Sequence, residues 1–191
     1  MTFDKSSGRY NEEEIFNYLE QRKNILDGIC ITGGEPLLQL DIKDFIKKVK
    51  NLNLKVKLDT NGTNYLKLKE LIDEDLVDYV AMDVKNTFEK YPLTTGVKEL
   101  DLDNIKKSMA LLKKGKIEYE FRTTIVKDFH KYEDIENICK IIGKNSKYYL
   151  QNFIDSDNVL KKGLHGFSDE ELINMKEDLE TNYNNVKIRG L

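Results

Sequence analysis

Three clusters of polar residues have the types and spacing to do chemistry, and each follows directly on an apolar segment. They are Gly33-Gly34-Glu35-Pro36, Asp59-Thr60-Asn61-Gly62 and Asp83-Val84-Lys85. If the apolar segments are parallel strands, their carboxyl ends meet on one face and bring the clusters together. Carboxylates beside a single lysine suit a ligand that has both an ammonium group and a carboxylate. The spacing therefore predicts a site for an amino acid or an amino-acid derivative.

Each cluster also has a structural interpretation that stays open at this point. Gly33-Gly34 with Glu35 could form a tight turn with a solvated carboxylate, and Asn61-Gly62 is a common turn dipeptide. Asp83 and Lys85 could form a surface ion pair, or Lys85 could be the Schiff-base lysine of a barrel aldolase. The glycine spacings of dinucleotide-binding and phosphate-binding loops do not occur in these clusters, so neither kind of site is predicted.

Five further residues are of types that often have functional roles. Arg122 lies inside a β-branched run, where a charge needs a partner, and we expect it to reach the site at the strand end. His130 and His165 stand alone in loops without a second ligand at metal spacing, so we predict solvated histidines. Cys30 and Cys139 lie in apolar segments, and we predict that both pack in the core.

Apolar residues alternate between strand-like and helix-like spacing along the whole chain. Predicted strands cover residues 28–32, 55–60, 79–83, 117–126, 148–153 and 186–189. Predicted helices cover 12–26, 41–52, 66–72, a segment ending at Gly115, 132–142 and a last one starting at Ser168. Asn11 with Glu14 and Ser168 with Glu171 are capping-box pairs, and a loop of about fifteen residues is expected after Asp83. This alternation predicts an α/β fold with a parallel sheet, either a barrel or a doubly wound sheet.

The first predicted helix has no strand before it. A parallel strand–helix repeat normally begins with a strand, because the helix crosses back from that strand to the next one. We therefore expect a sheet that lacks its first β-strand. Such a sheet exposes the strand around residues 28–32 at a free edge, which favours dimerisation or aggregation.

Composition narrows the class of protein. The 191 residues are 39% hydrophobic and 34% charged, which is enough for one core, so we expect a single domain over residues 1–191. A net charge of −3 argues against nucleic-acid or membrane partners. No apolar run approaches the ~20 residues that cross a bilayer, and residues 1–5 do not open a signal peptide. We expect a soluble, cytoplasmic protein.

The polar clusters belong to a longer series of motifs that extends through most of the chain. In order these are ITGGEPLLQ (31–39), KLDTNG (57–62), VDYVAMDVK (77–85), TGV (95–97), YEFRTT (119–124) and LQNF (150–153). This series resembles the radical S-adenosylmethionine superfamily. Within it the series is most similar to the activators of glycyl-radical enzymes, particularly the activating protein of anaerobic ribonucleoside-triphosphate reductase.

The resemblance implies a partial (β/α)6 TIM-like barrel that binds S-adenosylmethionine against a [4Fe-4S] cluster. A 5′-deoxyadenosyl radical would take hydrogen from a backbone glycine of the partner reductase, with flavodoxin or ferredoxin as electron donor. Gly33, Gly34 and Glu35 would meet the methionyl amino group. Asp83 and Lys85 would lie at the carboxylate. The residues placed at S-adenosylmethionine are Gly33, Gly34, Glu35, Pro36, Asp59, Thr60, Asp83, Lys85 and Arg122, with Asp59 and Thr60 also near a monovalent cation.

The chain departs from this family at the cluster. The family holds its cluster on a Cys-x-x-x-Cys-x-x-Cys loop before the helix that precedes Gly-Gly-Glu-Pro, and no cysteine lies there in this sequence. Cys30 and Cys139 cannot replace three thiolates on one loop. We therefore expect no cluster on this chain, and a single N-terminally truncated radical-SAM domain that is inactive by itself. Pyruvate formate-lyase activation, 7-carboxy-7-deazaguanine synthesis and a non-catalytic remnant that binds S-adenosylmethionine or a partner remain alternatives.

Overall fold

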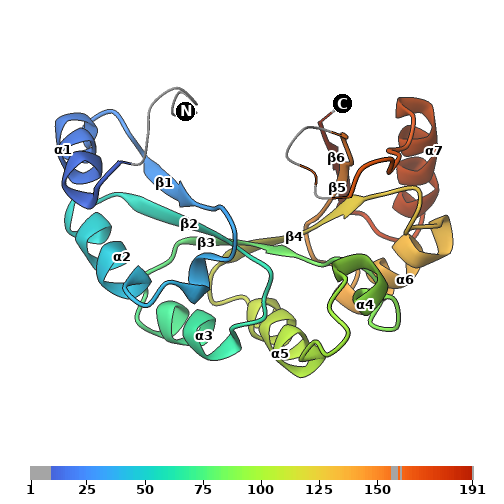
Figure 1. Cartoon of the computed structure of the whole chain (residues 1–191), viewed down its shortest axis with the longest axis horizontal. Helices are drawn as coiled ribbons and strands as arrows, with labels where there is room; N and C mark the ends of the chain where they lie inside the picture. The colour runs from blue at the N-terminus through green and yellow to red at the C-terminus, as the bar shows by residue number, and fades with distance from the viewer. Residues whose placement is uncertain (1–9, 156–158, 160, 191) are drawn as a thin grey trace.

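The computed structural model describes residues 10–155, 159 and 161–190, in which helices and strands alternate (Figure 1). The strands are β1 (Gly28–Ile31), β2 (Lys55–Thr60), β3 (Tyr79–Asp83), β4 (Glu118–Ile125), β5 (Tyr148–Asn152) and β6 (Val186–Arg189). The helices are α1 (Glu12–Arg22), the 3-10 helix η1 (Pro36–Leu38), α2 (Ile42–Asn51), α3 (Tyr65–Asp73), α4 (Tyr91–Thr95), α5 (Leu102–Lys113), α6 (Tyr132–Ile142) and α7 (Asp169–Glu180).

The strands form one parallel sheet in the order β1-β2-β3-β4-β5-β6. Figure 1 shows the sheet curved into an arc, with the helices along its outer side and an open gap between β1 and β6. This confirms the predicted α/β fold, a partial TIM-like barrel of parallel strands. Among the described residues β1 pairs only with β2, and α1 precedes it without an earlier strand.

The strands carry apolar side chains on the helix-covered face and polar side chains on the concave face. In β2, Val56 and Leu58 are fully buried, whereas Lys57 and Asp59 alternate with them. Successive side chains of a strand point to opposite faces, so this period of two directs the polar residues into the concave side. The apolar residues instead form a continuous core beneath the helices.

Local signals in the sequence account for most helix boundaries. Both predicted capping boxes are present, with Asn11 and Ser168 accepting from the backbone N–H groups of Glu14 and Glu171. The predicted strands agree with the observed ones to within one residue at each end. None of the described helices is long and apolar enough to cross a membrane.

Three differences from the sequence-based expectations concern short or terminal segments. The first helix ends at Arg22, not at residue 26. The expected loop after β3 contains the one-turn helix α4, which has Pro92 in its first turn and ends at Gly96 in the left-handed conformation. The 3-10 helix η1 was not expected either. A helix of one turn contains too few apolar residues to show a period, so only its caps could have indicated it.

Candidate functional site

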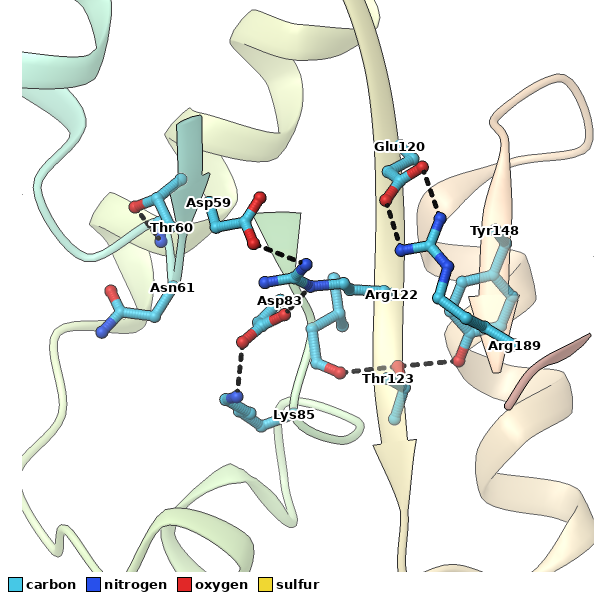
Figure 2. Close-up of polar contacts among 12 residues, drawn as sticks. Asp59, Thr60, Asn61, Asp83, Lys85, Glu120, Arg122, Thr123, Tyr148 and Arg189 are labelled. Carbon is cyan, nitrogen blue, oxygen red and sulfur yellow. Dashed lines mark hydrogen bonds and ion pairs between the residues drawn. The ribbon is translucent and has the colours of Figure 1, made fainter. Parts of the chain in front are cut away.

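Arg122 lies between two carboxylates at the carboxyl ends of neighbouring strands. Its Nη1 is 2.9 Å from Asp59 Oδ2, and its Nε is 2.5 Å from Asp83 Oδ1 (Figure 2). The strand register produces this arrangement, because Asp83 of β3 is directly opposite Arg122 of β4 and Asp59 lies on the other side of β3. The expectation that Arg122 reaches the strand-end cluster is therefore met in the geometry.

Two lysines extend this arrangement on either side. Lys85 Nζ is 2.7 Å from Asp83 Oδ2, and Lys57 forms an ion pair with Asp59. Lys57, Asp59, Arg122, Asp83 and Lys85 thus form one row of alternating charge, here called the charged row. The Lys85 and Asp83 side chains are 35% and 26% exposed, and Arg122 is only 14% exposed. Lys57 at the other end is 32% exposed but its partner Asp59 only 11%, so Asp83–Lys85 is the ion pair of the charged row in which both partners are accessible.

The ion pairs keep the interior of the charged row ionised. Burial works to raise the pKa of Asp59, but hydrogen bonds from Lys57 and Arg122 outweigh it and hold the pKa below its usual value. Burial likewise works to lower the pKa of Arg122, and the bonds to Asp83 and Asp59 raise it above its usual value. Both groups are charged at neutral pH because each stabilises the other's charged form.

Glu35 is used by the chain itself. Its Oε1 accepts from Thr60 Oγ1 at 2.8 Å and from the N–H of Leu37 at 3.2 Å. Its Oε2 accepts from the N–H of Asn61 at 2.7 Å. The carboxylate thereby caps η1 and joins the loop after β1 to the end of β2. We expected Glu35 to meet a ligand ammonium group, but both of its oxygens already have partners in this structure.

The glycines before Glu35 remain open to a ligand. Gly33 has a φ of +137°, which favours glycine, and a Cβ built on Gly33 or Gly34 would meet no atom within 4 Å. Pro36 is buried as the first residue of η1. The peptide groups of Gly33 and Gly34 are therefore exposed on a loop that Glu35 and Pro36 hold in place.

The Asn61-Gly62 dipeptide forms the turn that the structural interpretation predicted. Gly62 has a φ of +76°, and a Cβ there would lie 2.1 Å from Met82 Cε. Its carbonyl accepts from Ser108 Oγ of α5 at 2.8 Å. The positive φ and the close approach of the Met82 side chain both favour glycine here, so Gly62 has a structural role in closing the turn.

A second ion pair on the concave face, between buried Glu120 and partly exposed Arg189, was not predicted. Glu120 is 3% exposed and accepts from Arg189 Nη1 and Nη2 at 3.0 and 3.2 Å (Figure 2). Tyr79 Oη also donates to Glu120 at 2.8 Å. Glu120 and Arg122 are two residues apart on β4, and Lys57 and Asp59 are two apart on β2. This spacing of charged residues was the signal in the sequence for a charged concave face.

Two residue-level expectations were wrong. His130 is 2% exposed rather than solvated, and its ring nitrogens bond to backbone groups. Cys30 is exposed rather than in the core, with Sγ 3.7 Å from Asp59 Oδ1, because its position in β1 points to the concave face. His165 is exposed and Cys139 is buried, as predicted.

The cysteines of this chain do not fit a [4Fe-4S] cluster. There are two cysteines in the sequence, and the cluster needs thiolates grouped on one loop. Burial raises the pKa of Cys139 to about 12, and burial together with Asp59 raises that of Cys30. Within the described residues, no group of three or more His, Cys, Asp or Glu side chains is placed to hold a metal ion.

The charged row and the open glycines stand at the places where the sequence matches a known family. The sequence profile of the radical SAM superfamily matches residues 2–142. This chain belongs to the radical SAM superfamily. Members of the superfamily bind S-adenosylmethionine and a [4Fe-4S] cluster. Asp83 and Lys85 carry charges opposite to the ammonium and carboxylate groups of S-adenosylmethionine. The two cysteines of the chain do not supply the thiolate ligands of a [4Fe-4S] cluster.

Individual relatives agree with this assignment. A protein of Methanocaldococcus jannaschii named as a glycyl-radical enzyme activating enzyme is 40% identical over 150 residues, 76% of this chain and 61% of that protein. The chain thus spans less than two thirds of the curated relatives it matches.

Two solved structures share the fold. One is a domain of a pyruvate-formate lyase-activating enzyme from Bacteroides vulgatus. Its alignment covers 85% of this chain and 99% of that domain, with a TM-score of 0.66 and 18% identity. The other is Streptococcus suis SuiB bound to S-adenosylmethionine. Its alignment covers 96% of this chain and 44% of that protein, with a TM-score of 0.74 and 16% identity.

Proposed function

We propose that this chain carries the S-adenosylmethionine site of a glycyl-radical enzyme activating enzyme, and that the whole protein activates anaerobic ribonucleoside-triphosphate reductase. Membership of the radical SAM superfamily and the relative named as such an activating enzyme support the first part. The motif series described above supports the second part. We place the whole protein in the cytoplasm, with flavodoxin or ferredoxin as electron donor.

The observation that carries the proposal is the Asp83–Lys85 pair at the end of β3. It offers a carboxylate and an ammonium group 2.7 Å apart, each accessible to solvent. The methionyl end of S-adenosylmethionine bears the complementary ammonium and carboxylate. Arg122 already neutralises Asp59 and holds the other oxygen of Asp83. Lys85 is therefore the cation for the ligand carboxylate, and the peptides of Gly33 and Gly34 line the neighbouring loop.

Bound S-adenosylmethionine supplies the adenosyl group for radical chemistry in this superfamily. The residues described here bind and orient its methionyl end. They include no set of cluster ligands, so the electron that starts the reaction is not assigned to them. The proposed role of this chain is recognition of the ligand.

The binding proposal is tested by titrating the chain with S-adenosylmethionine and following amide chemical shifts by NMR. We expect saturable shifts at the ends of β1, β2 and β3, with a dissociation constant on the order of 1 mM because few partly exposed charges make the contacts. Lys85→Gln should weaken binding about fivefold, while Lys140→Gln on the outer helix α6 should not change it. Shifts that never saturate, or that ignore Lys85→Gln, would overturn the proposal.

The partner is tested on the whole protein with its cluster. Electron paramagnetic resonance should detect a glycyl radical on anaerobic ribonucleotide reductase after incubation with the activator, reductant and S-adenosylmethionine. A radical on pyruvate formate-lyase instead would assign the alternative partner. If neither protein acquires a radical, the proposed activation reaction is wrong.

A further inference from the structure

The peptide of Lys85 is held by two buried side chains from other segments. Its N–H donates to Tyr91 Oη at 3.0 Å, and its carbonyl accepts from His130 Nε2 at 2.8 Å. Tyr91 is 1% exposed and His130 is 2% exposed. Backbone groups that lie beyond the end of a strand need a partner, and commonly water or the next turn supplies it. Here two buried rings take that role on both sides of one residue.

The partners of His130 determine its tautomer. Nε2 lies 2.8 Å from the Lys85 carbonyl, which can only accept, and Nδ1 lies 3.0 Å from the backbone nitrogen and 3.2 Å from the carbonyl oxygen of Val126. The ring proton is therefore on Nε2, which donates to the Lys85 carbonyl. Burial lowers the pKa of His130, which favours the neutral ring that this pattern requires. Hydrogen bonds on both sides thus fix the ring between the end of β4 and Lys85.

The two segments that supply these rings are themselves tied together. Asn86, the residue after Lys85, is fully buried. Its Nδ2 donates to Thr94 Oγ1 of α4 at 2.8 Å and to the carbonyl of Phe129 at 3.2 Å. α4 carries Tyr91, and the turn of Phe129 carries His130. The loop after β3, α4 and the turn after β4 therefore form one hydrogen-bonded unit around Lys85.

We propose that His130 and Tyr91 are positioning residues, which hold the Lys85 peptide so that its ammonium group stays at the end of β3 for a ligand carboxylate. This inference rests on the proposed function, because the carboxylate is that of S-adenosylmethionine. The Lys85 side chain is flexible, so its Nζ remains near Asp83 only while its backbone is fixed. Releasing the peptide lowers affinity for the ligand carboxylate and leaves affinity for the rest of the ligand unchanged.

The same hydrogen bonds make the arrangement sensitive to acid. The charged groups that face His130 are Asp134, which favours the protonated ring, and Lys90, which disfavours it. These two pair with each other at 2.7 Å, so burial is the dominant influence on the ring. Protonation places a hydrogen on Nδ1, which then no longer accepts from the N–H of Val126 and can bond only to the Val126 carbonyl at 3.2 Å.

The test compares Tyr91→Phe with the matched control Tyr119→Phe. Tyr119 lies near the amino end of β4, and its hydroxyl contacts Ser146 rather than Lys85. Each variant is titrated with S-adenosylmethionine and with decarboxylated S-adenosylmethionine, which lacks only the carboxylate. Tyr91→Phe should weaken the first ligand about fivefold and leave the second unchanged. Tyr119→Phe should affect neither, and the ratio within one variant does not depend on its stability.

His130 is tested by partial rescue. His130→Leu should reduce the preference for the carboxylate-bearing ligand, and His130→Gln, which can still donate to the Lys85 carbonyl, should retain more of it. Equal losses for both ligands, or an unchanged ratio in both Tyr91→Phe and His130→Leu, would overturn the proposal.

Amide exchange separates this inference from the proposed function. If the wild type binds neither ligand, the proposed function fails. The positioning role is then judged by hydrogen exchange at the Lys85 amide, which should accelerate about tenfold in Tyr91→Phe and stay unchanged in Tyr119→Phe. Equal exchange in the wild type and in Tyr91→Phe would refute it in either case.

Discussion

The Glu35 carboxylate lies 2.8 Å from the Thr60 hydroxyl, and this contact joins the loop after β1 to the end of β2. The N–H of Asn61 donates to the other Glu35 oxygen. Glu35 thus connects two of the three polar clusters through direct hydrogen bonds. Both of its oxygens have partners within the chain, whereas the Asp83–Lys85 pair and the glycines before Glu35 are exposed.

Glu35→Gln should lower the free energy of unfolding by about 2 kcal/mol. The new amide group would face the donors of Asn61 or of Thr60, so one of these hydrogen bonds is lost. Urea denaturation measures the change. Glu177→Gln on the exposed side of α7 is the control, and an equal effect of the two substitutions would contradict the bridging role.

Arg122→Gln should destabilise the protein at pH 7 by on the order of 3 kcal/mol, because two carboxylates lose a partner. In the wild type the pKa of Asp59 is held below its usual value. Its contribution to stability is therefore present above the unfolded pKa of about 3.9 and lost as the pH falls through the folded pKa. The difference between wild type and Arg122→Gln should narrow on acidification below about pH 4.

Denaturant unfolding at a series of pH values measures this difference. Arg122→Lys serves as the comparison, since it keeps the charge but replaces the planar guanidinium by a compact ammonium group with different donor geometry. If the difference in free energy of unfolding between wild type and Arg122→Gln does not change with pH, the ionised Asp59 carboxylate does not contribute to stability through Arg122.

His130 should make the free energy of unfolding depend on pH at higher pH values than Asp59 does. Burial lowers the pKa of His130 below the unfolded value of about 6.5. The unfolded chain then binds a proton that the folded one does not, so stability is lost as the pH falls from about 6.5 toward the folded pKa. Unfolding measured from pH 5 to 8 should show this slope in wild type and in His165→Gln, and not in His130→Gln.

Within the described residues, β1 has a strand partner on one side, and its other edge should promote association of this chain. The Asp27 carbonyl accepts from the N–H of Lys55 of β2, so alternate residues face β2, and the N–H of Cys30 faces the edge. Light scattering should show a mass that rises above 22.3 kDa with concentration. Cys30→Pro removes the edge N–H and should keep the mass near the monomer value.

Cys30→Ser is the control for this experiment. It removes the exposed thiol but keeps the backbone donor, so it should associate like the wild type under reducing conditions. If association occurs only without reductant and Cys30→Ser abolishes it, a disulfide and not the strand edge is responsible.

Anaerobic treatment of this chain with iron and sulfide should not produce a stable [4Fe-4S] chromophore. The reason is the ligand set, since one of the two thiols is buried and the other lies alone on β1. Absorption near the cluster band after desalting measures the outcome. A stable chromophore that survives desalting and disappears in Cys30→Ser would show that our account of the ligands is wrong.

Much of the fold could be read from the sequence because apolar periodicity and capping residues are local signals. Strand pairing also followed, since regular strand–helix alternation implies parallel neighbours. The convergence of Asp59, Asp83 and Arg122 was predictable for the same reason. Asp59 and Asp83 lie near the carboxyl ends of β2 and β3, and the register places Arg122, from the middle of β4, opposite Asp83.

The partners of the individual side chains could not be predicted in the same way. Whether Glu35 meets a ligand or the N–H of Asn61 depends on how closely two loops approach. His130 looked solvated because it stands in a polar loop, yet the turn after β4 folds inward and buries it against Lys85. Cys30 looked like a core residue because its neighbours are apolar, whereas a strand sends alternate residues to opposite faces. Such outcomes depend on tertiary distances that a linear pattern does not contain.

The order of strands in the sheet is the same as their order along the chain. Each of the described strands therefore pairs only with the strand that precedes or follows it in the sequence. Folding can grow outward from any adjacent pair of strands, with a modest loop-closure cost at each addition. The amides of β3 and β4, bonded on both sides, should be the slowest to exchange, and those of β1 and β6 the first to open.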